Sequence, residues 1–150
     1  MTAVEVPAPF TVSKIRPQLV SKGKAKEDFC RTETLRVGVQ VVAPTEGETN
    51  LHAHPGTDSA WVVLDGQATF YGTEDDIEIS VLNKNEMISI PEGTPYWFKC
   101  SGEQPLVMLH ITANTKNFVP GVKRKNYKPT KDWFLDRGHA DAVPETFFGD

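Results

Sequence analysis

A series of short apolar segments separated by turn residues constrains the fold of this chain more than any other feature. From Leu35 to Ala43 every second residue is apolar, which is typical of a half-buried strand, and Pro44 ends it. Roughly seven or eight such segments lie between 35 and 113, with turn signals about every 8 to 12 residues and no helical period. We therefore expect an all-β fold, an antiparallel jelly roll, sandwich or small barrel that can line a pocket for one small ligand.

The length of 150 residues predicts one domain with its own core. We divide it into an N-terminal arm over 1–34, a barrel over 35–113 and a C-terminal extension over 114–150. The extension begins with basic residues and then keeps several large apolar ones. We expect these to pack on the barrel or on a second subunit, with a possible short helical turn over 131–137; they are Trp133, Phe134, Leu135, Phe147 and Phe148.

Charge and composition exclude several classes of partner. The net charge of −4 argues against nucleic acid or an anionic membrane as the main partner. No apolar run approaches the roughly 18 residues that a membrane span needs, and no signal peptide is visible. The two cysteines, Cys30 and Cys100, are far apart in the sequence. We therefore expect a cytoplasmic, reduced protein without a disulfide framework.

Two of the four histidines, His52 and His54, are separated by one residue. In an extended strand they point to the same face, so two imidazoles can hold one metal ion between them. The apolar run Trp61 to Leu64 follows, and Asp65-Gly66 closes it as a hairpin turn. The pattern places the histidine pair at the mouth of a β-structure.

These motifs resemble those of the cupin superfamily. The residues that carry the first cupin motif here are Gly47, His52, His54 and Gly66, and Pro91-Glu92-Gly93 matches the second. Asn85 stands where the second motif begins with glycine, and asparagine also tolerates a left-handed turn. The resemblance implies a jelly-roll barrel whose three histidines and one glutamate hold iron, manganese, zinc, nickel or copper.

The chain departs from the cupin pattern at the other ligand positions. Tyr96 occupies the slot of the third histidine, and Cys100 occupies that of a following asparagine. The glutamate slot is taken by Ser59 or Asp58, depending on the direction of counting. His52, His54 and Asp58 would form a facial triad for a divalent transition metal such as Fe, Mn, Zn or Ni.

The remaining candidate residues have more than one interpretation. Tyr96 ligates a metal as phenolate, or it donates or accepts a proton at a bound substrate. His110 has two interpretations: it completes the site, or it points away from the core together with Met108. The second follows because the alternate residues of the same strand form the cleaner apolar face; they are Val107, Leu109 and Ile111. Trp61 and Phe98 share the parity of the ligand slots, so they are candidates for an apolar pocket wall.

Three functions fit these residues. The first is a small metal-dependent cupin enzyme acting on a small organic substrate by dioxygenase, isomerase, lyase or cyclase chemistry. The second is a metal-free enzyme in which His52, His54 and Tyr96 perform acid–base chemistry. The third is a non-catalytic module that binds a small ligand. The family resemblance and the aromatic extension further predict a homodimer.

Overall fold

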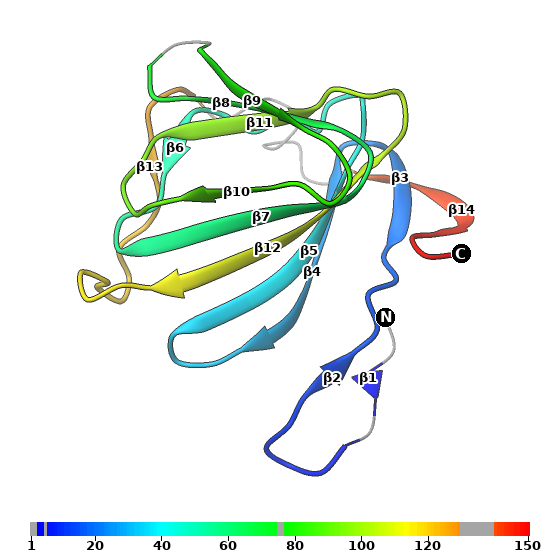
Figure 1. Ribbon diagram of the computed structural model, residues 1–150, viewed down its shortest axis with the longest axis horizontal. Coiled ribbons are helices and arrows are strands. Elements are labelled where there is room, and N and C mark those ends of the chain that lie inside the picture. The colour runs from blue at the N-terminus through cyan, green and yellow to red at the C-terminus, as the bar shows by residue number, and fades with distance from the viewer. Residues whose placement is uncertain (1–2, 5, 75–76, 130–139) are drawn as a thin grey trace.

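The computed structural model describes residues 3–4, 6–74, 77–129 and 140–150, and the element labels follow Figure 1. The described residues form strands, turns and loops without any helix, which confirms the all-β prediction. No helix long and apolar enough to cross a membrane occurs among them. The predicted helical turn at 131–137, together with Trp133, Phe134 and Leu135, lies outside the described residues.

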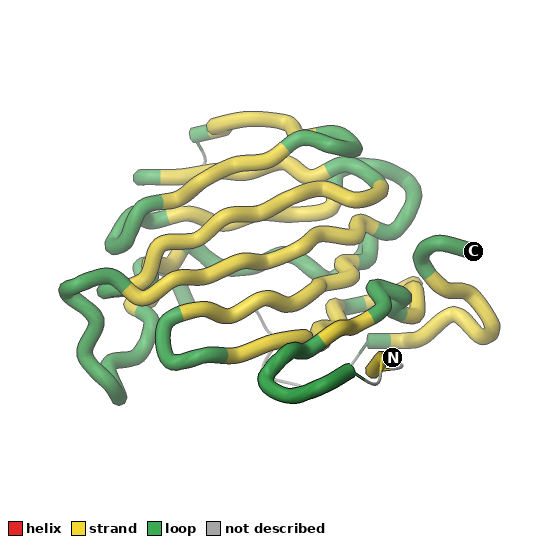
Figure 2. Tube along the Cα trace, turned by 60° about the horizontal axis from the view of Figure 1, so that its bottom comes forward, coloured by secondary structure: helices red, strands yellow, loops and turns green. Residues whose placement is uncertain are grey.

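Two five-stranded antiparallel sheets face each other and form the barrel (Figures 1 and 2). The first sheet has the order β10 (Met87–Ile90), β7 (Thr57–Asp65), β12 (Leu106–Asn114), β5 (Leu35–Val42) and β4 (Lys24–Arg31). The second has the order β13 (Lys125–Asn126), β6 (His52–Ala53), β11 (Tyr96–Cys100), β8 (Ala68–Gly72) and β9 (Glu78–Leu82). The jelly-roll architecture is thus as predicted.

The strand region begins earlier than the predicted boundary at residue 35. β4 lies within the expected N-terminal arm, yet it pairs with β5 from Lys24↔Val42 to Arg31↔Arg36. Lys24 faces the same side of the sheet as Val42 because cross-strand partners share a face. This strand therefore carries a lysine to the inner side of the barrel.

The barrel interior is filled by side chains from both sheets. Trp61 of the first sheet contacts Phe98 and Phe70 of the second, with ring centroids 4.8 and 6.3 Å apart. Met108 is fully buried in this inner core, which corrects the interpretation that it points outward with His110. The inner core consists of Val42, Trp61, Val63, Ala68, Phe70, Leu82, Ile90, Tyr96, Phe98, Cys100, Leu106 and Met108.

A second core covers the outer face of the first sheet. Val39, Val41 and Val107 point away from the barrel interior and pack with Val20 of β3 (Gln18–Lys22). The alternation from Leu35 to Ala43 therefore marks the outer face of β5, and the inner face carries Gln40 and Val42. Since both faces of this sheet are buried, an apolar stripe alone does not identify the inside of the barrel.

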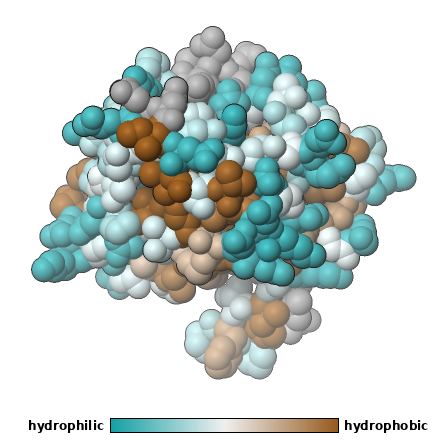
Figure 3. Space-filling model, turned by 45° about the horizontal axis from the view of Figure 1, so that its top comes forward, coloured by the Kyte–Doolittle hydropathy of each residue, from teal (hydrophilic) through white to brown (hydrophobic). Residues whose placement is uncertain are grey.

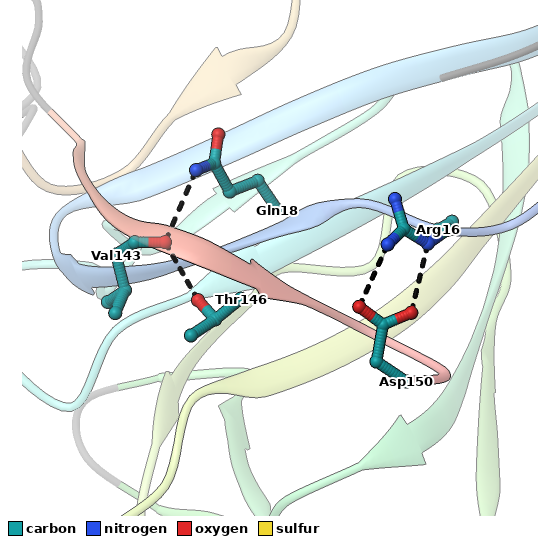
Figure 4. Close-up of polar contacts among 5 residues, drawn as sticks. All are labelled: Arg16, Gln18, Val143, Thr146 and Asp150. Carbon is teal, nitrogen blue, oxygen red and sulfur yellow. Dashed lines mark hydrogen bonds and ion pairs between the residues drawn. The ribbon is translucent and has the colours of Figure 1, made fainter.

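The two ends of the chain provide this outer cover. β14 (Asp141–Phe147) pairs with β3, and the two strands lie together beside the first sheet (Figures 1 and 2). Arg16 forms a bidentate ion pair with Asp150, at 3.0 and 2.8 Å, and its guanidinium lies 4.1 Å from the Phe147 ring (Figure 4). Two further hydrogen bonds converge on the Val143 carbonyl, from Gln18 Nε2 and Thr146 Oγ1. Before β3 in the chain, β1 (Ala3–Val4) pairs with β2 (Val12–Ser13) as a separate two-stranded sheet.

Exposed apolar side chains gather at the edge of the second sheet. Ile77, Ile79 and Val81, on or next to the edge strand β9, are 56%, 51% and 38% exposed. Figure 3 shows a group of hydrophobic residues among hydrophilic ones on the side that lies at the top of Figure 1, where β8, β9 and β11 are found.

Candidate functional site

His52 is buried at the centre of three short strand segments. β6 pairs with β11 through His52↔Tyr96 and with β13 through His52↔Asn126. The Nδ1 atom of His52 lies 2.6 Å from the Asn50 carbonyl oxygen. Because a carbonyl can only accept, Nδ1 carries the proton and donates. The Nε2 atom of the neutral ring is thus left as an acceptor.

The rings of His52, His54 and Tyr96 form one compact group, which we call the His–Tyr cluster. Their centroids are 4.9 Å apart for the two histidines, 4.6 Å for His52 and Tyr96, and 6.1 Å for His54 and Tyr96. The structure thus brings together three of the candidate residues: strand parity puts His52 and His54 on one face, and Tyr96 is the cross-strand partner of His52.

Burial and positive neighbours fix the protonation states of the cluster. Burial, together with the positive charge of the Arg124 guanidinium, lowers the pKa of His52 to about 3 and that of His54 to about 4. Burial also raises the pKa of the Tyr96 phenol to about 12, against opposing effects of the Trp61 indole and Arg124. At neutral pH both imidazoles are therefore uncharged and the phenol keeps its proton.

His110 enters the barrel from β12 and stacks on Trp61 of β7. Their ring centroids are 3.7 Å apart with an interplanar angle of 7°. Burial lowers the pKa of His110 to about 3. Its Nε2 atom and Trp61 Nε1 are buried and have no hydrogen-bond partner among the described residues, and the same holds for Gln40 Oε1 on the neighbouring strand β5. The Trp61 indole lowers the pKa of the Tyr96 phenol as a hydrogen-bond donor would, although no hydrogen bond of normal geometry joins the two groups.

A basic network that sequence reasoning missed borders the cluster. Arg124 precedes β13 and donates from Nε to Asn126 Oδ1 at 3.0 Å and from Nη2 to Asn50 Oδ1. The Asn50 amide in turn donates to Asn126 Oδ1 at 2.9 Å and to the Lys128 carbonyl at 3.0 Å. Since the Asn50 carbonyl also accepts from His52, one asparagine links the arginine to the cluster.

Lys24 adds a second cation. Burial, together with the charges of Lys26 and Arg124, lowers the pKa of its ammonium to about 8. Its Nζ lies 5.8 Å from the centroid of the Phe98 ring. The lysines at 22, 24 and 26 are easily interpreted as solvated surface, and only the pairing of β4 in the sheet reveals that Lys24 faces inward.

The structure does not bring Asp58 to the histidine pair. Asp58 is exposed, and its Oδ1 accepts a hydrogen bond from the Glu92 backbone N–H at 2.8 Å. Ser59, the alternative residue for the glutamate slot, is 5% exposed and shares the inner face of β7 with Trp61. Strand alternation explains the difference, because neighbouring residues face opposite sides.

The donor set does not fit the usual four-ligand cupin metal centre. Nowhere in the described part of the chain do three side chains of His, Cys, Asp or Glu lie together as a metal site. His52 and His54 supply two neutral imidazoles, whereas the glutamate position holds a hydroxyl and the third histidine position holds a protonated phenol. The positively charged side chains of Arg124 and Lys24 nearby further disfavour the binding of a metal cation.

The turn of the second motif holds the backbone next to His54. Gly93 has φ +73° and donates its N–H to the His54 carbonyl at 3.1 Å. Thr115 Oγ1 and Asn117 Nδ2 both donate to the Glu92 carboxylate at 2.7 Å, and these bonds lower its pKa. Asn85, in the glycine position of the motif, has φ +69°, the left-handed conformation expected there.

Comparison with known proteins agrees with this architecture. The cupin domain family matches residues 38–112, half of the chain. An acireductone dioxygenase of Enterobacter sp. (strain 638) is 34% identical over 71 residues, which cover 47% of this chain and 39% of that protein. The acireductone dioxygenase of Citrobacter koseri is 28% identical over 119 residues, which cover 77% of this chain and 66% of that protein. The chain thus spans less than two thirds of the length of these relatives.

Solved structures share the fold at low sequence identity. A conserved protein of Klebsiella pneumoniae with a double-stranded β-helix domain superposes with a TM-score of 0.58 at 18% identity, covering 71% of this chain and 86% of that one. The TT1209 protein of Thermus thermophilus superposes with a TM-score of 0.54 at 20% identity, covering 62% of this chain and 85% of that one. Lys24, Arg124 and Asn126 all lie outside the family-matched residues.

Proposed function

Because the chain belongs to the cupin domain family, we propose that it is an enzyme that transfers protons on a small carbonyl compound bound inside its barrel. The observation that carries this proposal is the His–Tyr cluster, in which two neutral imidazoles and a protonated phenol lie within 6.1 Å of one another, measured between ring centroids. At neutral pH an uncharged imidazole can accept a proton, and a protonated phenol can donate one.

The residues have separate roles in this proposal. His52 accepts a proton at Nε2, because the Asn50 carbonyl fixes the hydrogen on Nδ1. Tyr96 donates a hydrogen bond or a proton to the substrate oxygen, since its pKa of about 12 keeps it protonated. His54 lies at the edge of the same group and orients the substrate. Isomerase or lyase chemistry fits such a site.

Deuterium exchange in D2O tests this function even though the product is unidentified. The EDTA-treated protein is incubated with a panel of small ketones and 1,2-dicarbonyl compounds, and loss of the proton next to the carbonyl is followed by proton NMR. His52→Gln and Tyr96→Phe should slow the exchange by about 10²-fold or more. Tyr71→Phe is the matched control, because Tyr71 stacks on Trp97 outside the cluster. Absence of exchange with every compound would refute the proposal.

A metal-dependent reaction is the second candidate, and one observation favours it. The proton on Nδ1 of His52 leaves its Nε2 lone pair available to a metal. His52 and His54 would hold Fe, Mn, Zn or Ni, and the metal would supply Lewis-acid or dioxygen chemistry. If exchange or turnover disappears with EDTA and returns with one of these metals, this candidate replaces the first. Metal content of untagged protein below about a tenth of an equivalent, with no gain on reconstitution, would exclude it.

We further propose that the protein is a homodimer. The exposed residues Ile77, Ile79 and Val81 at the edge of the second sheet support this, because a contiguous apolar edge favours association. Sedimentation of a clean monomer at working concentration would refute it.

A further inference from the structure

Arg124 carries a positive charge that no described carboxylate pairs with. Its guanidinium is half-buried, and its hydrogen-bond partners, Asn50 and Asn126, contribute neutral amide oxygens. Burial of a guanidinium is costly unless the charge is paired. Two of its nitrogens are occupied by the asparagines, and no described residue accepts a hydrogen bond from Nη1.

The asparagines hold Arg124 in place beside the cluster. Asn50 is 4% exposed, and each polar atom of its side chain is already bonded within the network. Arg124 acts electrostatically on Tyr96, His52 and His54, so its charge is close to all three rings. A fixed, planar guanidinium that no described carboxylate neutralises, held beside the His–Tyr cluster, is suited to a carboxylate, which it binds through two parallel N–H donors.

The Trp61–His110 stack offers neutral polar groups inside the barrel. Trp61 Nε1 and His110 Nε2 are buried without described partners, and their rings are stacked 3.7 Å apart. Buried polar atoms are normally satisfied, so unpaired atoms on the inner face indicate a ligand or water between the sheets. A ligand in this position would present an anionic end to Arg124 and a polar, unsaturated body to the Trp61–His110 stack.

We propose that Arg124 binds the carboxylate of the substrate, so that the site accepts small carboxylic acids as their anions. This inference rests on the proposed function for the location of the site, and it names the class of compound that the site takes. Arg124, which would select the carboxylate, lies outside residues 38–112, the part of the chain that matches the cupin domain family. The anion specificity is thus a property of this chain's own C-terminal segment.

Binding of matched acid and amide pairs tests the proposal. The EDTA-treated full chain is titrated with acetate against acetamide and with benzoate against benzamide, and the Trp61 indole N–H resonance is followed by ¹H–¹⁵N NMR. The carboxylate of at least one pair should bind on the order of tenfold or more tightly than its amide, as expected for hydrogen bonds to a charged group. Equal affinity of acid and amide in both pairs would overturn the proposal.

Two variants test whether Arg124 causes the preference for the carboxylate over the amide. Arg124→Gln should abolish it, and Lys123→Gln, which removes the same charge from the adjacent exposed residue, should keep it. Equal losses in both variants would show that general charge attraction is responsible and would overturn the assignment. If Arg124→Gln does not fold, Arg124→Lys serves instead and should weaken the preference, because one ammonium cannot replace the planar donor pair. An unchanged preference in the variant that folds would overturn it.

The outcome is separable from that of the exchange assay. Tyr96→Phe should keep the carboxylate preference while losing deuterium exchange. A carboxylate preference without any exchange refutes the enzyme proposal alone, whereas exchange without a preference refutes the role of Arg124 alone.

Discussion

Lowering the pH from about 7 to about 5 should strongly destabilise the metal-free protein, because His52, His54 and His110 are buried in their neutral forms. In the unfolded chain these imidazoles regain their ordinary pKa of 6.5, whereas their folded values are about 3, 4 and 3. The unfolded state therefore binds more protons over this range. The stabilisation is complete above pH 6.5 and is lost as the pH falls toward the folded pKa values.

The expected loss follows from proton linkage. Each histidine that is protonated in the unfolded chain and neutral in the fold contributes about 2 kcal/mol between pH 7 and pH 5, or about 6 kcal/mol for all three. The loss depends mainly on the unfolded pKa, because the folded values lie at least about one unit below pH 5. A typical domain has about 5–15 kcal/mol of stability, so the protein should be close to its unfolding threshold at the lower pH.

Urea unfolding followed by circular dichroism in EDTA, at several pH values, measures this loss. His110→Gln should reduce the loss of unfolding free energy between pH 7 and pH 5 by about 2 kcal/mol, since one titrating group is removed. Lys123→Gln, which removes a charge but no histidine, should keep the full loss. A change below about 1 kcal/mol between the two pH values would refute the reasoning, because it would mean that the histidines accept protons in the folded state.

Three further predictions concern the fold and the site. Asn50→Ala should cost about 2 kcal/mol in urea unfolding, because it removes the buried amide that joins Arg124 to the Lys128 carbonyl. Met108→Ala should cost about 3 kcal/mol by opening a cavity, whereas Met87→Ala, at a side chain that is 55% exposed, should change stability by less than about 0.5 kcal/mol; equal costs would contradict the inward direction of Met108. Asp58→Ala should leave carboxylate binding unchanged in the NMR titration, and a tenfold loss would place Asp58 in the site after all.

Local patterns in the sequence predicted the barrel well. The turn at Asp65-Gly66 forms as expected, with Gly66 at φ +83° and its N–H bonded to Asp65 Oδ1 at 3.1 Å. The hairpin predicted there is wrong, because β7 and β8 on either side of this turn belong to different sheets and do not pair with each other. A side chain at Gly66 would come within 2.8 Å of the Pro105 carbonyl, so the glycine is required for close approach as well as for the turn. Turn geometry depends on a few neighbouring residues, which is why sequence reasoning reaches it.

The sequence predicted less well which way some side chains point and which residues lie next to the His–Tyr cluster. The apolar parity of Val107 and Leu109 suggested that His110 points away from the core, but that parity faces the outer core formed with Val20 and Val39. Arg124 lies 28 residues after Tyr96 in sequence and meets it only through the pairing of β13 with β6. Long-range pairing of a two-residue strand leaves no periodic signal, so the sequence does not distinguish Arg124 from the other basic residues of the extension.

The cover formed by β3 and β14 has a practical consequence for any shortened form of the protein. A fragment cut to residues 38–112 would lose Val20, Ala140 and Phe148, and the valines of β5 would then face water. It would also lose β4, which would leave β5 as an unpaired edge. Such a fragment should aggregate instead of reporting on the site, so the recognisable half of this chain is not its smallest working unit.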